Sequence, residues 1–325
     1  MRALVCKQYG PPSQLTLDEL DDPKPSKGQI LIKVKAAGIN FPDVLSIEGK
    51  YQVKTEPPFI PGNEASGIIK AVGEGVERFK PGDKVITMSK GGAFADKCIS
   101  DENMTIPLFP ALNFSQGAGF MVTYSTSYHA LKQSAELKEG ETILVLGAAG
   151  GVGVTAIEIA KAMGARVIAA ASSNEKLEFA KDVGADETVN YTKSSLKEAV
   201  KELTNGKGVD VVYDPVGGEL TDAALRATAW HGRYLVIGFA SGDIPKFAAN
   251  ILLLKEASAI GVWWGTWAAK NPHKHIQNIK ELGAMIASGD ITPRVTEEFN
   301  IDQYKEAFEV ITERRAKGKV ILTMN

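Results

Sequence analysis

The stretch LGAAGGVGVTAIEIAK, residues 146–161, places four glycines within seven positions directly before a helix-forming segment. The residues before it, TILVL (142–146), form a continuous apolar run that is typical of a buried parallel strand. Behind the glycines, apolar residues recur at helical spacing and predict one buried helix face: Val152, Ala156, Ile159 and Met163. The glycines therefore occupy a turn between a buried strand and a helix.

Within this turn, Ala148, Gly150 and Gly153 match the spacing G-x-G-x-x-G, with alanine at its first position. In that fingerprint one residue makes the tight turn, the next lets a pyrophosphate approach, and the last lets the helix pack on the strand. The helix N-terminus adds unpaired N–H groups and the positive end of its dipole. We expect the following residues to bind a dinucleotide, the alternative being an ordinary glycine-rich turn: Gly150, Gly151, Val152 and Gly153.

The next predicted strand, in ARVIAAASSNEKL (165–177), indicates which dinucleotide is bound. Sheets that bind NAD usually carry a carboxylate at this strand end to hold the ribose 2′-hydroxyl. Here the strand ends in Ala171 and two serines, and Lys176 follows one helical turn later, where it could meet a 2′-phosphate. The sequence therefore predicts NADPH. Ser173 is also a candidate helix N-cap with Lys176 as a solvated charge, and the two roles can coexist.

The length of 325 residues favours two domains, and the pattern changes along the chain accordingly. The first third consists of short strands and turns, as in a β-rich, barrel-like domain. From about residue 124 to 264, five strand-like runs alternate with helical periods and predict a parallel α/β sheet: TILVLG, ARVIAAA, VDVVYD, RYLVIGF and SAIGVWW. We expect domains at 1–122 and 123–264, with residues 265–325 returning to complete the first domain.

Composition excludes several classes of function. The net charge of −2 gives no broad field for nucleic acid or an anionic membrane, and no apolar run reaches the 18 residues of a membrane span. The N-terminus lacks the apolar core of a signal peptide, so we expect a cytoplasmic protein. Cys6 and Cys98 are the only cysteines, which excludes a disulfide framework and a four-cysteine zinc site.

The chain resembles the zinc-free NADPH:quinone oxidoreductase (ζ-crystallin-like) branch of the medium-chain dehydrogenase/reductase superfamily. The resemblance spans nearly the whole chain and rests on five segments in order: AAGINFPDVL (36–45), PGNEASGIIKAVGEGVERFKPGDKV (61–85), TYSTSYHAL (123–131), GAAGGVG (147–153) and VIGFASG (236–242). It implies a doubly wound Rossmann domain inserted in a GroES-like, β-rich catalytic domain, with the active site in the cleft between them.

The chain departs from the zinc alcohol dehydrogenases of that superfamily at their metal ligands. Asn40 stands where they have a cysteine, and Gly62-Asn63-Glu64 stands where they have Gly-His-Glu. We therefore expect no bound metal. Without a Lewis acid, hydride transfer to an acceptor that is already activated by conjugation, such as a quinone or an enone, needs the least help.

The resemblance also assigns site residues. It places Asn40 and Asp43 near the nicotinamide and substrate, and Thr126 and Tyr128 on the opposite wall. Tyr51 would donate a proton or shape the pocket. Tyr191 would hold the adenosine phosphate region, or else be a half-buried loop aromatic. Backbone bordering the nicotinamide would come from Phe239, Ala240, Val262, Trp263 and Trp264, and either Arg314 or Arg315 would reach the cofactor.

The leading hypothesis is an NADPH-dependent reductase of quinones or other α,β-unsaturated carbonyls. A related alternative is reduction of enoyl or acrylyl thioesters, and a different class is a crystallin-like NADPH- or RNA-binding protein. Ser194 and Lys197 have the spacing of a Ser/Lys acylation pair, but Ser195 with Glu198 also reads as a helix capping box. The run SAIGVWW should form the last strand of the Rossmann sheet and pair with its copy in a homodimer.

Overall fold

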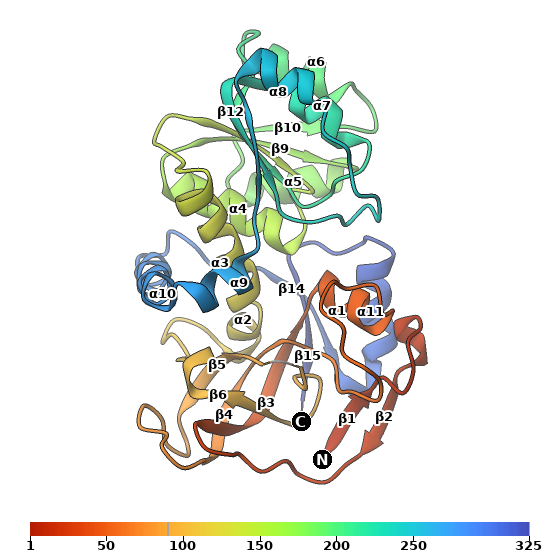
Figure 1. Cartoon of the computed structure of the whole chain (residues 1–325), viewed down its shortest axis with the longest axis vertical. Helices are drawn as coiled ribbons and strands as arrows, with labels where there is room; N and C mark the ends of the chain where they lie inside the picture. The colour runs from red at the N-terminus through yellow and green to blue at the C-terminus, as the bar shows by residue number, and fades with distance from the viewer. Residues whose placement is uncertain (90, 325) are drawn as a thin grey trace. The chain divides into compact units, whose positions relative to one another are not determined.

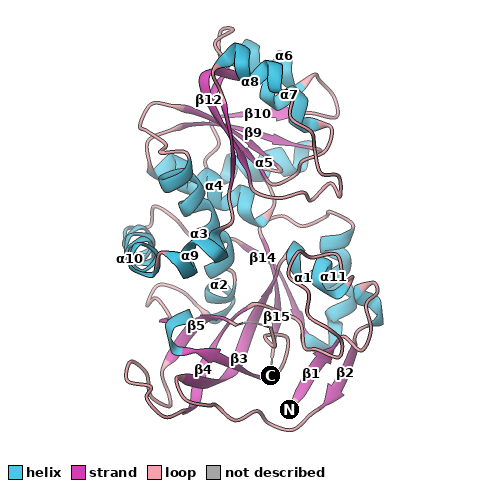
Figure 2. Cartoon of the chain, viewed as in Figure 1, coloured by secondary structure: helices cyan, strands magenta, loops and turns pink. Residues whose placement is uncertain are grey.

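The computed structural model describes residues 1–89 and 91–324. The chain forms two compact units (Figure 1). The first contains residues 1–122 together with the chain from Pro293 onward, and the second contains Thr123–Thr292. Helices and strands alternate regularly in the second unit, whereas strands dominate the first (Figure 2). None of the helices in the described ranges has the length and apolarity needed to cross a bilayer.

The first unit is built on a sheet in the order β14-β15-β3-β4-β5-β7, with β6 pairing to β3 and a separate ladder β1-β2. Its strands are β1 (Arg2–Val5), β2 (Thr16–Glu19), β3 (Gln29–Ile39), β4 (Glu64–Val72), β5 (Lys84–Met88), β6 (Lys97–Asp101), β7 (Thr105–Pro107), β14 (Val295–Asn300) and β15 (Lys319–Thr323). Its helices are α1 (Phe41–Ile47), α2 (Phe114–Ala118) and α11 (Tyr304–Thr312), with 3₁₀ turns η1 (Pro12–Gln14), η2 (Glu102–Met104) and η4 (Ile301–Gln303).

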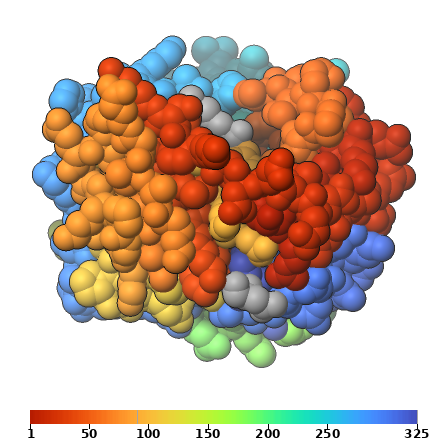
Figure 3. Space-filling model, turned by 90° about the horizontal axis from the view of Figure 1, so that it is seen from below, coloured from red at the N-terminus to blue at the C-terminus, as the bar shows by residue number. Residues whose placement is uncertain are grey.

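Alternation along β3 shows why this sheet forms. Ile30, Ile32 and Val34 are buried, while the residues between them are only partly covered, as expected for a strand with one face on the core. The buried face packs against Phe94 and against Phe308 of α11, whose rings meet edge to face at 5.8 Å. Figure 3 shows the side of this unit that is covered mainly by its red and orange N-terminal segments.

The second unit contains a fully parallel sheet in the order β10-β9-β8-β11-β12-β13, which is the doubly wound Rossmann order. Its strands are β8 (Thr142–Leu146), β9 (Arg166–Ala171), β10 (Glu187–Asn190), β11 (Val209–Asp214), β12 (Thr228–Val236) and β13 (Ser258–Gly261). Its helices are α3 (Met121–His129, which begins in the first unit), the π-helical turn η3 (Ala130–Ser134), α4 (Gly151–Ala162), α5 (Asn174–Val183), α6 (Leu196–Leu203), α7 (Leu220–Arg226), α8 (Ala249–Lys255), α9 (Trp264–Lys270) and α10 (Pro272–Ser288).

Helices cover both faces of this sheet, as the fold requires. α4 and α5 pack together, and α7 packs against both α6 and α8. Leu144 and Ile168 of the sheet share one buried cluster with Val200 of α6, Leu225 of α7 and Ile251 of α8. Strands that are buried on both faces carry continuous apolar runs, which explains why β8, β9 and β11 could be predicted from sequence.

The structure corrects the expected position of residues 265–292, which belong to the second unit rather than to a return segment. Polar contacts hold α10 there: Asn278 and Gln133 exchange hydrogen bonds of 2.9 and 3.1 Å, and Glu281 accepts from both Tyr128 and Lys132. α11 and β15 pack with the first unit as expected, together with β14, which no apolar run predicted.

The prediction for α4 is also incomplete. Ala156 and Ile159 are buried, but Val152 is only partly covered and Met163 follows the end of the helix. The middle of α4 is buried on all sides, including the polar residues Thr155 and Glu158. Tyr124 of α3 donates a hydrogen bond to Glu158, so α3 covers the helix face that the sequence pattern left open.

Candidate active site

The glycine-rich turn follows the carboxyl end of β8. Gly147 has a positive φ of 57°, so this residue makes the tight turn that the spacing had assigned to Ala148. Gly150 caps the N-terminus of α4 in an extended conformation. A Cβ at Gly153 would lie 2.4 Å from the carbonyl oxygen of Gly147. Gly153 is therefore required for close packing of the helix on the strand.

Gly150 differs from Gly153 in a way that matters for ligand binding. A Cβ added there would approach the protein no closer than 3.4 Å, at the carbonyl oxygen of Gly147, which is ordinary van der Waals contact. Its φ of −75° suits any residue. Neither packing nor backbone conformation of the chain itself demands glycine at this position. The bare backbone at the N-terminus of α4 fits the close approach of a phosphate.

The residues at the end of β9 include no carboxylate, as the sequence indicated. Ser173 is the N-cap of α5, and its hydroxyl oxygen accepts a hydrogen bond of 3.3 Å from the backbone N–H of Lys176. The capping role of Ser173 is thus present in the structure. After β10, Tyr191 donates its backbone N–H to Ala171, and its half-buried ring packs against the core of the unit.

The loops after β11, β12 and β13 continue this edge of the sheet. Asp214 at the end of β11 accepts hydrogen bonds from the N–H groups of Val216 and Gly217, which fixes the loop after it. Ala240 donates to Pro215 in that loop, and Val262 donates to Val236. Because all strands are parallel, the expected cofactor residues follow carboxyl strand ends along one edge, where dinucleotides bind in such sheets: Gly150, Gly151, Val152, Gly153, Ser173, Lys176, Tyr191, Phe239, Ala240, Val262, Trp263 and Trp264.

The first unit holds a second group of expected residues in a buried polar cluster. Asn40, between β3 and α1, donates from Nδ2 to Oε1 of Glu64 at 2.9 Å and accepts at Oδ1 from Nζ of Lys319 at 2.9 Å. Lys319 also donates to Glu64. The backbone N–H of Asn40 donates to Oδ2 of Asp43 at 2.8 Å, and Asn63 donates to Oδ1 at 2.7 Å. We call these five residues the polar cluster: Asn40, Asp43, Asn63, Glu64 and Lys319.

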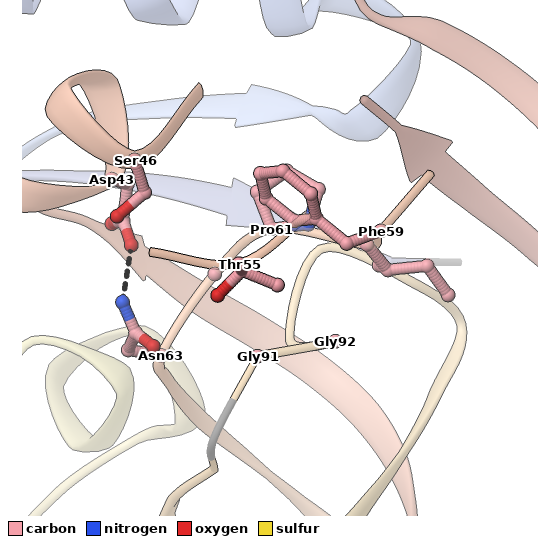
Figure 4. Close-up of a pocket in the computed structure, with 10 residues that line it drawn as sticks. Asp43, Ser46, Thr55, Phe59, Pro61, Asn63, Gly91 and Gly92 are labelled. Carbon is pink, nitrogen blue, oxygen red and sulfur yellow. Dashed lines mark hydrogen bonds between the residues drawn. The ribbon is translucent and has the colours of Figure 1, made fainter. Parts of the chain in front are cut away.

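The carboxyl group of Asp43 connects the polar cluster to a cavity of about 270 Å³ (Figure 4). Lining residues include Asp43, Ser46, Phe59 and Asn63. Burial raises the pKa of Asp43 to about 7, although its hydrogen bonds and the charge of Lys319 act in the opposite direction. A carboxyl group with this pKa can both hold and release a proton near neutral pH.

Tyr51 lies on the segment that follows α1, with its backbone N–H donating to Leu45. Burial raises the pKa of its phenol, and the negative charge of Asp43 raises it further. The phenol is therefore protonated at neutral pH, and it lies close enough to Asp43 for the carboxylate charge to affect its pKa. Tyr51 is not one of the residues that line the cavity in Figure 4, so its role as proton donor or pocket wall stays a prediction.

Thr126 and Tyr128 of α3 have different surroundings. Thr126 is half-buried, whereas the Tyr128 hydroxyl donates to Glu281 of α10. Burial together with Glu281 raises the pKa of Tyr128. Tyr128 therefore ties α3 to α10, and its hydroxyl is already committed to a carboxylate.

That Arg314 or Arg315 reaches the cofactor stays a prediction, and a different cation lies in the polar cluster. Arg315 pairs with Glu313 on the surface, at 2.7 Å. The cation in the cluster is Lys319, which sequence reasoning missed because it reads as an ordinary residue opening a C-terminal strand. Its partner Glu64 lies 255 positions away, so no local pattern could reveal the contact.

The Ser/Lys pair finds no support in the geometry. The Ser194 hydroxyl donates to the carbonyl of Asn190, and Lys197 pairs with Glu198 at 2.9 Å. Ser195 caps α6 by accepting a hydrogen bond from the N–H of Glu198. These residues thus begin a helix.

A zinc ion is implied by the wider superfamily, and the residues present do not fit it. The side-chain amides of Asn40 and Asn63 are weak ligands for zinc. The ammonium group of Lys319 already contacts Asn40 and Glu64. Across residues 1–89 and 91–324, no three His, Cys, Asp or Glu side chains group in a way that could hold a metal ion.

Comparisons with known proteins agree with this fold. Residues 26–133 match the alcohol dehydrogenase GroES-like domain, and residues 151–286 match the family described as zinc-binding dehydrogenase. Quinone oxidoreductase-like protein 2 of Bos taurus is 37% identical over 99% of this chain and 92% of its own length.

Two solved structures are also similar. The Escherichia coli quinone oxidoreductase complexed with NADPH has a TM-score of 0.94 at 30% identity and covers both chains completely. The CurK enoyl reductase has a TM-score of 0.89 at 26% identity, covering 100% of this chain and 99% of its own. Together, the Rossmann order, the GroES-like unit and the full-length relatives show that the chain belongs to the quinone oxidoreductase branch of the medium-chain dehydrogenase/reductase superfamily.

Proposed function

We propose that the protein is an NADPH-dependent reductase of quinones or other α,β-unsaturated carbonyl compounds, acting by hydride transfer without a metal. The observation that carries the proposal is the polar cluster: Asn40 and Asn63, which stand where the zinc relatives have metal ligands, are hydrogen-bonded to Glu64, Lys319 and Asp43. Conjugated acceptors take up a hydride without metal polarisation, which matches such a site.

NADPH would be held along the carboxyl edge of the second unit's sheet. The N-terminus of α4 with Gly150 fits the pyrophosphate, and the carboxylate-free end of β9 with Lys176 suits a 2′-phosphate. When bound, NADPH supplies a hydride. The E. coli relative, whose structure contains NADPH, supports this choice of cofactor.

The polar cluster supplies proton chemistry. A conjugated acceptor that has gained a hydride carries a negative charge and must take up a proton to give a neutral product. The protonated Asp43 carboxyl lies at the cavity and can give up this proton, becoming a carboxylate that is stabilised by Asn40, Asn63 and the Lys319 ammonium. Tyr51 would donate a proton as well, or would only shape the pocket.

A substrate panel tests the proposal. Purified protein is mixed with NADPH and quinones, enones, enoyl thioesters or simple aldehydes, and loss of nicotinamide absorbance is followed. We expect quinones and enones to have the highest kcat/KM and simple aldehydes to be inert. Turnover of aldehydes that requires zinc would overturn the proposal.

A second candidate is reduction of enoyl or acrylyl thioesters. It is favoured by the likeness to the CurK enoyl reductase, which covers the whole chain. The same panel separates the two functions, since a thioester reductase would show its highest kcat/KM with the thioester.

We also propose that the protein is a cytoplasmic homodimer. In the described part of the chain, β13 pairs with β12 on one side and forms the end of the sheet. Ser258, Ala259 and Gly261 are exposed there, and an open strand edge can be closed by a two-fold copy.

A further inference from the structure

Lys319 is a buried cation. It is only 5% exposed, and its Nζ donates to three oxygens: the carbonyl of Ile39 at 3.2 Å, Oδ1 of Asn40 at 2.9 Å, and Oε1 of Glu64. Glu64 is fully buried and accepts at Oε2 from the backbone N–H of Val122 at 2.9 Å. Both ions are thus desolvated and fully hydrogen-bonded within one unit.

Two glycines make room for this pair. A Cβ at Gly38 would lie 2.4 Å from the carbonyl oxygen of Ala118, 2.6 Å from Oε1 of Glu64 and 3.0 Å from Nζ of Lys319. A Cβ at Gly119 would lie 3.1 Å from Cγ of Lys319. Neither glycine has a positive φ, so space is what these positions need. A side chain at either position would therefore crowd the ion pair.

An ion pair of this kind adds little to stability by itself, since desolvation cancels most of the attraction. Its position suggests another role, because it is joined through Asn40 to the carboxyl group at the cavity. The positive charge of Lys319 neutralises the negative charge of Glu64. When Asp43 is ionised, the polar cluster therefore has a net charge of one negative unit. Protonating Asp43 makes the cluster neutral.

We propose that Lys319 is a positioning residue whose buried ammonium group, through Asn40 and Glu64, sets the orientation and charge of the Asp43 carboxyl for proton transfer. This inference rests on the reductase function proposed above. Lys319 itself touches neither substrate nor cofactor in this scheme.

The charged and titratable groups facing Asp43 come from three places. Lys319 of β15 lowers the pKa of Asp43, Glu64 of β4 raises it, and Tyr51 lies near enough to be affected by Asp43 in turn. Of the two charges, Lys319 has the larger effect. Neutralising Glu64 and neutralising Lys319 should therefore move the pKa of Asp43 in opposite directions.

The experiment uses full-length Glu64→Gln, Lys319→Met and Lys319→Arg proteins. The expected shift in the pKa of Asp43 is about 1 unit downward in Glu64→Gln and about 1 unit upward in Lys319→Met, with little change in Lys319→Arg. Glu64→Gln retains the shape of the side chain, so the proposal stays testable if Lys319→Met fails to fold. Lys70→Met and Glu298→Gln, exposed on strands of the same sheet, are matched controls.

Two readouts are needed. Carbon-13 NMR titration of aspartate carboxyl groups in the cofactor-free protein, assigned with Asp43→Asn, reports the pKa of Asp43 directly. The pH profile of kcat for NADPH-driven quinone reduction reports its use in turnover. Opposite pKa shifts that are matched by opposite shifts of the profile would establish the inference.

Other outcomes are distinguishable. Opposite NMR shifts in a protein that reduces no acceptor would support the internal cation while refuting the reductase function. An unchanged pKa of Asp43 in folded Glu64→Gln and Lys319→Met would overturn the inference. So would a pH profile that stays fixed in an active enzyme while the pKa moves.

Discussion

The side-chain amide of Asn63 donates a 2.7 Å hydrogen bond to Oδ1 of Asp43, inside a site where burial nevertheless raises the pKa of that carboxyl to about 7. Burial thus outweighs the hydrogen bonds that favour the ionised form. This balance makes stability depend on pH. In the unfolded chain an aspartate has a pKa near 3.9, so the native state binds a proton more tightly.

The first prediction concerns that dependence. The stability contributed by protonated Asp43 is complete below about pH 4 and is lost as the pH rises toward 7. Between pH 5 and pH 8 the wild type should lose roughly 2 to 3 kcal/mol relative to Asp43→Asn, which cannot titrate. Urea unfolding of both proteins at the two pH values measures this difference. Parallel pH curves would show that Asp43 has an ordinary pKa.

The second prediction separates two glycines of one turn. Gly150→Ala should fold normally, because its Cβ meets nothing closer than 3.4 Å, yet should bind NADPH and NADH more weakly. Gly153→Ala should destabilise the fold, since its Cβ would lie 2.4 Å from the Gly147 carbonyl oxygen. Thermal unfolding and cofactor titration distinguish them. Equal melting temperatures for the two variants would contradict the packing argument.

The third prediction concerns cofactor choice. Lys176→Ala should weaken NADPH by roughly 10- to 100-fold and leave NADH nearly unchanged, because a charge-assisted hydrogen bond to the 2′-phosphate is removed. Ser173→Ala is the comparison variant: loss of this N-cap should lower the free energy of unfolding by about 1 kcal/mol. Values of kcat/KM for both cofactors provide the measurement. A wild type that prefers NADH would reverse the assignment.

The fourth prediction concerns metal. Since an ammonium group contacts Asn40 and Glu64 in the polar cluster, purified protein should contain no stoichiometric zinc and keep its activity in chelator. Elemental analysis and an EDTA-treated assay measure this. One zinc per chain, with activity lost on its removal, would exclude the metal-free mechanism.

The fifth prediction concerns assembly. Light scattering should give twice the 34.8 kDa of one chain at micromolar concentration. Ala259→Glu should weaken the dimer, since a two-fold contact brings the added charges near one another. Thr266→Glu, at an exposed position of α9, is a matched control. A wild type that remains monomeric would refute the proposed pairing.

The sequence predicted most of the Rossmann sheet because its strands are buried on both faces and carry apolar runs. It missed β10, in which only Val189 is buried, since a short edge strand has no such run. The place of α10 depends on contacts such as Asn278 with Gln133, 145 positions apart. Local periodicity predicts a helix there but not what it packs against.

The candidate site was predictable to a similar degree. Motif spacing singled out Gly150 and Gly153, and resemblance placed Asn40 and Asp43 near the nicotinamide and substrate. The structure shows that Asn40 and Asp43 share a hydrogen bond, and their place beside a cofactor stays a prediction. The roles of Thr126 and Tyr51 stay predictions. Lys319 could not be found because a lysine that opens a strand is ordinarily solvated, and only folding shows that this one is buried.

The origin of Lys319 in β15 has a consequence for biosynthesis. Its partners Asn40 and Glu64 precede the second unit along the chain, whereas the strand that completes their cluster follows the second unit. While the ribosome is still translating the second unit, Lys319 is not yet available to pair with Glu64. During synthesis the polar cluster is therefore completed only when β15 emerges and pairs with β3.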